Sequence, residues 1–109
     1  MKDRDKFIAR FSSFKPELRL GNLASNLSRL GYMVSDKHGD QAELEMMREI
    51  AWMFELLGPS ATLELADMQR EICRWRNIWP VEETRSLLAF RARKMSERVL
   101  ELSGLLTSR

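Results

Sequence analysis

Apolar residues recur with helical spacing in the segment PELRLGNLASNLSRLGYMV, which covers residues 16–34. Gaps of three and four residues place its large apolar side chains on one face of a helix: Leu20, Leu23, Leu27, Leu30 and Val34. One position further along lies a small-residue stripe, which consists of Gly21, Ala24, Ser28 and Gly31. Small side chains let a second backbone approach closely, so we predict that another helix packs against this stripe. The pattern leaves two neighbours open: the N-terminal helix of the same chain, or a second subunit.

The same spacing predicts four further helices, over about 3–14, 41–57, 61–79 and 80–103. No segment alternates apolar and polar residues with a period of two, and β-branched residues are scarce, so the predicted class is all-α. The four longer helices have short connections. We therefore predict a single helical domain over residues 1–109, an antiparallel four-helix bundle with a short additional N-terminal helix.

Capping residues and proline set the expected helix boundaries. Asp40 followed by Glu43 resembles a capping box, with Asp in place of Ser or Thr. Ser60 or Thr62 can cap the next helix. Pro80 either breaks or kinks the chain, and we favour a new helix that starts near it, because the acidic residues that follow suit a first helical turn.

The short N-terminal helix carries an aromatic face made of Phe7, Phe11 and Phe14. Basic residues flank the aromatic side chains, which is also typical of a helix that lies on a membrane surface. Asp3 and Asp5 dilute that positive charge, and the segment is short. We favour packing of this face onto the body of the protein and predict no membrane contact.

Composition fits one soluble globular domain, with 109 residues, 44% hydrophobic and 31% charged. The single cysteine excludes an internal disulfide and fits a reducing compartment. No apolar run approaches the roughly 18–20 residues that span a bilayer. The first residues, MKDRDKF, lack the apolar core of a secretion signal. We therefore expect a cytoplasmic protein.

Charge is small in total but unevenly distributed. The formal net charge is +2, with 8 basic and 4 acidic residues in 1–39, 1 and 5 in 40–59, and 9 and 7 in 60–109. The basic first segment and the acidic second segment are expected to attract each other, within one subunit or across a dimer.

Residues suited to catalysis or to cofactor binding are few. His38 is the only histidine and lies in a loop, where a solvated turn residue is the simpler interpretation. Asp36, His38 and Asp40 could touch a metal ion, but three loop ligands without a helical anchor are a poor basis for a site. Cys73 is interpreted as an inert buried thiol. We predict that the protein is not an enzyme and binds no cofactor or metal.

Nucleic-acid binding is the main alternative function. Basic residues are dense on the last two predicted helices, and the candidate contacts are Arg74, Arg76, Arg91, Arg93 and Lys94. However, the tryptophans nearby fall on the regular apolar seam, which favours core packing over base stacking. Acidic residues are also interspersed among the arginines. Nucleic acid is therefore the second choice.

Protein–protein interaction is the preferred function, because the chain has more apolar surface than one small bundle covers. Trp52, Leu87 and Phe90 fall off the main seams, and together with the small-residue stripe they form the candidate partner interface. Homodimerisation is the simplest form of such an interaction, and another helical protein is the other candidate partner.

Two segments carry a resemblance to known proteins. PELRLGNLASNLSRL at residues 16–30 and RVLELSGLL at residues 98–106 are similar to segments of small helical proteins found in cyanobacteria, and make up about a quarter of the chain. The resemblance implies a cytoplasmic bacterial protein. It brings no catalytic motif and implies no activity.

Overall fold

The computed structural model describes residues 2–105, except for the side chains of Lys2 and Pro59. This part of the chain contains five α-helices and two short 3₁₀ turns. The elements are α1 (Lys2–Ser12), α2 (Pro16–Ser35), α3 (Asp40–Glu55), η1 (Gly58–Ser60), α4 (Leu63–Ile78), η2 (Glu82–Thr84) and α5 (Arg85–Ser103). No strand occurs within these residues. The predicted all-α bundle with a short additional N-terminal helix is confirmed.

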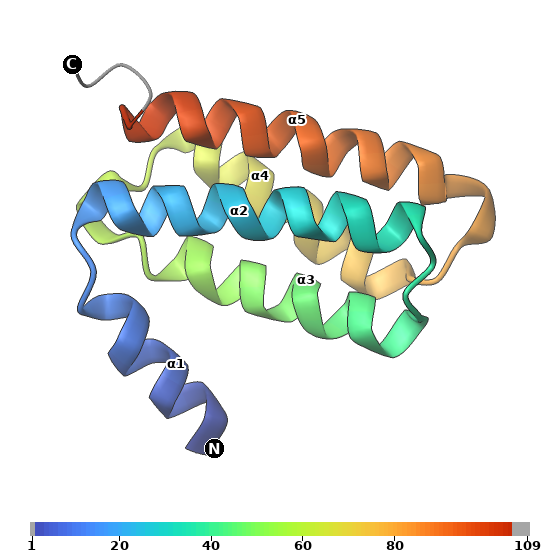
Figure 1. The fold of residues 1–109 in the computed structure, drawn as a ribbon, viewed down its shortest axis with the longest axis horizontal. Helices are drawn as coiled ribbons and strands as arrows, with labels where there is room; N and C mark the ends of the chain where they lie inside the picture. The colour runs from blue at the N-terminus through green and yellow to red at the C-terminus, as the bar shows by residue number, and fades with distance from the viewer. Residues whose placement is uncertain (1, 106–109) are drawn as a thin grey trace.

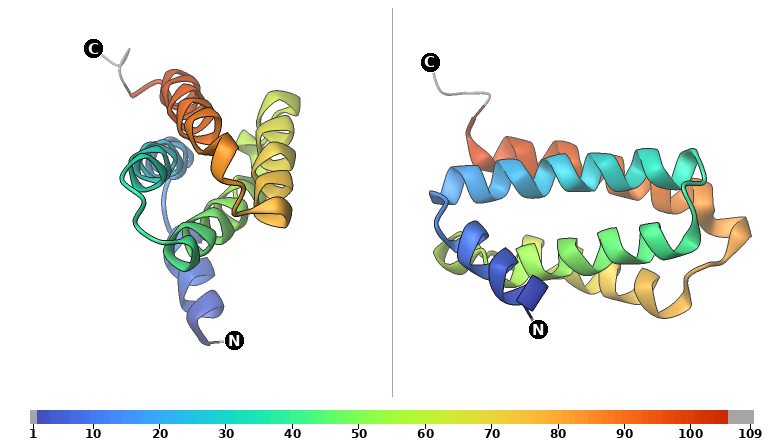
Figure 2. Two further views of the ribbon diagram at one scale, coloured as in Figure 1. Left: turned by 90° about the vertical axis from the view of Figure 1, so that its right-hand side faces the viewer. Right: turned by 60° about the horizontal axis from the view of Figure 1, so that its bottom comes forward.

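Helices α2 to α5 alternate in direction along the bundle (Figure 1). Helix α2 packs against α5 on one side and α3 on the other, and α4 closes the ring between α3 and α5 (Figure 2). Helices α3 and α5 therefore lie diagonally across the bundle. The α2–α5 contact is by far the most extensive, whereas α4 and α5 approach each other much less closely.

The leucine stripe of α2 lies in the core, as its spacing predicts. Leu23, Leu27 and Leu30 are fully buried, and each of the other long helices contributes its own seam to the same cluster. Trp75 and Trp79 belong to this core and pack edge to face, with ring centroids 6.3 Å apart. The interpretation of these tryptophans as core residues is confirmed.

The neighbour of the small-residue stripe is α5, which is neither of the two neighbours expected from the sequence. A Cβ atom at Gly31 would lie 3.0 Å from Arg93 Cγ and 3.1 Å from the Ala89 carbonyl oxygen. Next along α2, the Ser96 hydroxyl donates a hydrogen bond of 2.7 Å to the Ala24 carbonyl oxygen. Alanine and serine on the facing side of α5 let the two backbones approach closely.

The start of α4 and the end of α5 agree with the sequence-based expectations. Thr62 caps α4, because its hydroxyl oxygen accepts a hydrogen bond of 3.2 Å from the Leu65 amide. Helix α5 ends before Gly104, which has the left-handed conformation (φ 75°) that favours glycine.

Two boundary predictions are wrong. Asp40 is not a capping residue, because Gly39 holds the N-cap position of α3 and no side chain caps it. Both carboxylates of the expected capping box bind an arginine of α5 instead. The last helix begins at Arg85 rather than near Pro80: Trp79 and Val81 have extended conformations, and η2 precedes α5. Pro80, which follows a cis peptide bond, therefore separates two helices rather than kinking one.

Helix α1 packs onto its own chain beside the bundle (Figure 1). Phe11 is buried in the core cluster, and the Phe7 ring lies 5.6 Å from that of Trp52 on α3. Phe14 follows the helix, which ends at Ser12, and still packs against the core. Within residues 2–105, no helix combines the length and the apolar character needed to cross a membrane.

Candidate functional site

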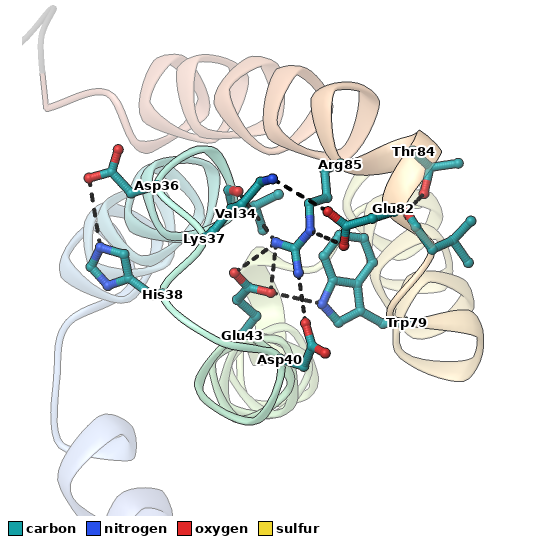
Figure 3. A network of polar contacts seen from close by, with 11 residues as sticks. Val34, Asp36, Lys37, His38, Asp40, Glu43, Trp79, Glu82, Thr84 and Arg85 are labelled. Carbon is teal, nitrogen blue, oxygen red and sulfur yellow. Dashed lines mark hydrogen bonds and ion pairs between the residues drawn. The ribbon is translucent and has the colours of Figure 1, made fainter.

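A network of charged side chains surrounds a buried ion pair at the end of the bundle where α2 meets α3 and α4 leads into α5 (Figure 3). The Glu43 side chain is fully buried, and both of its oxygens accept hydrogen bonds from Arg85 Nη1, at 3.1 and 3.0 Å. Trp79 Nε1 donates a further bond of 3.0 Å to Glu43. A fully buried carboxylate is tolerated only with such partners.

Arg85 binds acidic groups from several segments. Its Nε donates to Glu82 at 2.8 Å, and its Nη2 donates to Asp40 at 2.7 Å. Hydrogen bonds from Glu43 and then Glu82 raise the pKa of Arg85 above its usual value. The guanidinium also lies 4.9 Å above the Trp79 ring. The network joins α3, α5 and their connections. Each nitrogen of Arg85 already has a protein acceptor, so none is left free for a substrate.

The three residues considered for a metal site, Asp36, His38 and Asp40, do not point to a common ligand position but contact different protein groups. Asp40 binds Arg85, while His38 Nε2 lies 3.8 Å from Asp36 and its ring packs on Tyr32. Among residues 2–105 no group of three His, Cys, Asp or Glu side chains is arranged to hold a metal ion. The absence of enzymatic activity stays a prediction.

Helices α4 and α5 are held together by long charged side chains along one seam. Arg91 donates two hydrogen bonds to Glu71, of 2.9 and 2.8 Å, and Arg98 likewise binds Glu64 at 2.7 and 3.1 Å. The hydrogen bond from Arg91 lowers the pKa of Glu71, and that from Arg98 lowers the pKa of Glu64. These bidentate pairs fix the register of α4 against α5.

An apolar surface continues this seam toward the end of the bundle. Ile78 lies seven residues after Glu71 on the same stripe of α4, and Leu87 lies four residues before Arg91 on α5, so both follow the ion pairs. Ile78 and Leu87 are 54% and 53% exposed, and Phe90, one turn along α5 from Leu87, is 47% exposed. We call Ile78, Leu87 and Phe90 the α4–α5 apolar face.

A hollow of about 550 Å³ adjoins this face. It lies on α4 and is lined by Glu71, Arg74, Trp75, Asn77 and Ile78. Trp75 is itself almost fully buried, so the hollow has an aromatic side chain in its wall. The arrangement places an exposed phenylalanine and an apolar hollow on neighbouring helices of the same subunit.

The residues predicted to form the partner interface do not lie on one common surface. Gly31 and Ala24 are buried against α5, Gly21 is half-buried with Leu105 beside it, and Ser28 is exposed on α2. Trp52 lies on α3, diagonal to α5, and packs on α1. Only Leu87 and Phe90 share one surface. Ile78 is not among the residues predicted from the sequence, although it continues the seven-residue spacing of Glu64 and Glu71, which is a detectable signal.

Only some of the residues proposed for nucleic-acid contact share one surface, where Arg74 and Arg91 both lie near Glu71. Arg91 is paired with Glu71, and Lys94 lies 3.6 Å from Glu97 and above the Phe90 ring. Arg93 packs against α2 at Gly31. Arg74 lines the hollow beside Trp75, whereas Arg76 lines a second hollow between α3 and α4.

Comparison of the chain with family models, with curated proteins and with solved structures finds no match. The resemblance of residues 16–30 and 98–106 to helical cyanobacterial proteins stays a prediction.

Proposed function

We propose that the protein is a non-enzymatic helical interaction protein that forms a homodimer through the α4–α5 apolar face. The observation that carries the proposal is the combination of three exposed large apolar side chains, Ile78, Leu87 and Phe90, with the apolar hollow that Ile78 lines on α4. Isolated exposed apolar residues are common, but residues grouped next to a hollow are typical of contact surfaces.

A second copy of the chain is the occupant that this surface fits best. In a two-fold dimer each subunit offers the same patch, so Phe90 of each copy can enter the hollow beside Trp75 of the other. The charges at the rim have both signs, with Arg74 on α4 and Lys94 and Glu97 on α5. A rim of mixed sign can pair with its own two-fold copy, whereas a strongly acidic partner would meet Glu97 and Glu71.

Nucleic-acid binding has less support. Its five candidate cations lie on different sides of α4 and α5, and two of them already have an acidic partner in the chain. A phosphate backbone needs cations that lie along one surface.

Sedimentation velocity over a concentration series tests the proposal with the double variant Leu87→Ser/Phe90→Ser. We expect the wild-type chain to dimerise and the variant to have a dissociation constant at least about tenfold higher, because truncating central apolar contacts costs about 1–2 kcal/mol or more. The matched control is Leu63→Ser. Leu63 is 77% exposed at the other end of α4, so its loss removes a similar apolar group outside the proposed interface.

A wild-type chain that remains monomeric up to about 1 mM would overturn the proposal, since no useful affinity would then exist. A dimer that Leu63→Ser weakens as much as the double variant does would contradict the assignment of the interface. Circular dichroism of each variant establishes that the helical fold is retained.

A further inference from the structure

Two arginines without an ion pair face a hollow on the opposite side of α4 from the α4–α5 apolar face. The hollow has a volume of about 440 Å³, lies between α3 and α4, and is lined by Gln41, Leu44, Glu45, Arg48, Cys73, Arg76 and Asn77. Arg48 and Arg76 are both half-buried. Within residues 2–105, neither guanidinium has a carboxylate partner.

The environment of Arg48 fixes its guanidinium without neutralising it. The guanidinium carbon lies 4.9 Å from the centre of the Trp52 ring, which holds the side chain by a cation–π contact. Arg48 Nε is buried and has no hydrogen-bond partner among the described residues. Arg48 is only half-buried as a residue and lines the hollow, and it has no carboxylate partner among the described residues that an external oxyanion would have to displace.

Other half-buried or buried arginines of this protein have acceptors within the chain. Arg85 and Arg91 each hold carboxylates of neighbouring helices, and Arg19 donates to backbone carbonyl oxygens. In the α3–α4 hollow the one carboxylate that lines the wall, Glu45, accepts a hydrogen bond from Gln41 instead of from an arginine.

We propose that the α3–α4 hollow binds a small oxyanion, a carboxylate or phosphate group of a small molecule, between Arg48 and Arg76. The planar guanidinium presents paired donors that match either kind of oxyanion. The side-chain amides of Gln41 and Asn77 can orient the rest of the ligand. Two cations and one carboxylate leave a local charge near +1, which suits one anionic group. The site does not depend on dimerisation.

Cys73 provides a site-specific readout, because it is the only cysteine and lines the hollow; it is half-buried, which corrects the expectation of a buried thiol. Its alkylation by uncharged iodoacetamide is measured in a series of inorganic phosphate and, separately, of succinate, with sodium chloride holding the ionic strength constant. We expect saturable protection with one of the two probes, which identifies the preferred oxyanion. If the bound form does not react, alkylation is slowed about tenfold at ten times the dissociation constant.

Arg48→Gln and Arg76→Gln are each expected to abolish the protection, and Glu45→Gln to lower the half-saturating anion concentration. The matched control is Arg74→Gln, which removes a positive charge from the other side of α4 and should retain protection. Protection that is absent with both probes, does not saturate, or persists in both hollow variants would overturn the proposal. Equal loss in Arg74→Gln would do the same, since net charge rather than this site would then be responsible. Far-ultraviolet circular dichroism establishes that each variant is folded.

Discussion

Arg85 is the side chain whose loss leaves the largest uncompensated charge in the core. The substitution Arg85→Met removes the cation from Glu43, which is fully buried. We expect the free energy of unfolding at neutral pH to fall by about 3–5 kcal/mol, the usual cost of leaving a buried charge unpaired. Urea denaturation measures the change.

Two further variants distinguish the effect of an unpaired buried charge from that of losing any ion pair. Arg70→Met breaks the ion pair with Asp67, whose side chains are 59% and 63% exposed, and should cost less than about 1 kcal/mol. The double variant Glu43→Met/Arg85→Met should recover much of the loss, because it leaves no buried charge. An Arg85→Met protein as stable as the Arg70→Met protein would contradict this role of the network.

The Arg85 network was not predictable from the sequence. Its members come from residues 34, 40, 43, 79, 82 and 85, and their meeting depends on how two loops close the same end of the bundle. Local pattern assigned Asp40 and Glu43 to a helix cap, which is a reasonable role for acidic residues at that position. Arg85 overrides this role, because the fully buried Glu43 carboxylate requires a cation, and the half-exposed Asp40 binds the same guanidinium.

At the scale of helices, the α2–α5 contact predicts opposite results for two glycines of the same stripe. A Cβ atom at Gly31 would meet the Ala89 carbonyl oxygen at 3.1 Å, and backbone of a packed helix yields little. Gly31→Ala should therefore lower the free energy of unfolding by about 1–3 kcal/mol, as overpacking does. Thermal and urea denaturation measure it.

Gly21→Ala is the matched comparison on the same helix. Its new Cβ would lie 2.8 Å from Leu105 Cδ1, which is the end of a flexible and partly exposed side chain that can move. The gain in helix propensity, up to about 1 kcal/mol, should then make this variant neutral or more stable. If both alanine variants have the same stability, the close approach of α5 at Gly31 is not a constraint.

The α4–α5 seam predicts a specific dependence of stability on pH. Because the hydrogen bond from Arg91 lowers the pKa of Glu71 in the folded chain, this pair stabilises the protein fully above the unfolded pKa of about 4.3. The contribution is lost as the pH falls through the lower folded pKa. Glu71→Gln should therefore be less stable than wild type at neutral pH, and the difference should shrink toward about pH 3.

Urea denaturation at several pH values measures this convergence. Glu83→Gln is the control, because Glu83 is exposed and has no ion pair among the described residues, so its difference from wild type should stay near zero throughout. A difference for Glu71→Gln that is constant with pH would mean that the ion pair does not contribute through its charge.

Helical periodicity was sufficient to predict the helices but not to predict which helices pack against each other. The five helices and the core leucines follow from gaps of three and four, because a bundle buries one stripe of each helix. The small-residue stripe predicts a close contact but not which helix makes it. Ala89, Ala92 and Ser96 form a matching stripe on α5, and comparing the two stripes would have identified the pair. In the candidate site, Leu87 and Phe90 could be predicted as apolar residues off the main seam. Ile78 could be placed beside them only once the ion pairs had shown how α4 is aligned with α5.

At the scale of the whole molecule, the chain consists of a four-helix bundle and a separate α1 attached at few points. Arg19 of α2 joins them by donating to the carbonyl oxygens of Ser12 at 2.7 Å, Phe14 at 2.9 Å and Leu56 at 3.3 Å. Phe11 is the buried anchor of α1, and most other residues of this helix are exposed. An element with one buried anchor opens at lower free energy than elements packed along their whole length.

Amide hydrogen exchange should therefore divide the chain in two. We expect the amides of α1 to exchange faster than the central amides of α2 and α5, whose contact is the most extensive in the molecule. Arg19→Ala should accelerate exchange in α1 further, while exchange in α5 stays close to wild type, because the three hydrogen bonds of Arg19 hold the α1–α2 connection and the end of α3. Asn22→Ala is the control: among residues 2–105 the Asn22 side-chain amide donates its one hydrogen bond to Leu18 of its own helix, so exchange in α1 should be unchanged. Equal acceleration of α1 and α5 in Arg19→Ala would mean that α1 opens only when the whole bundle unfolds, and that the five helices form one cooperative unit.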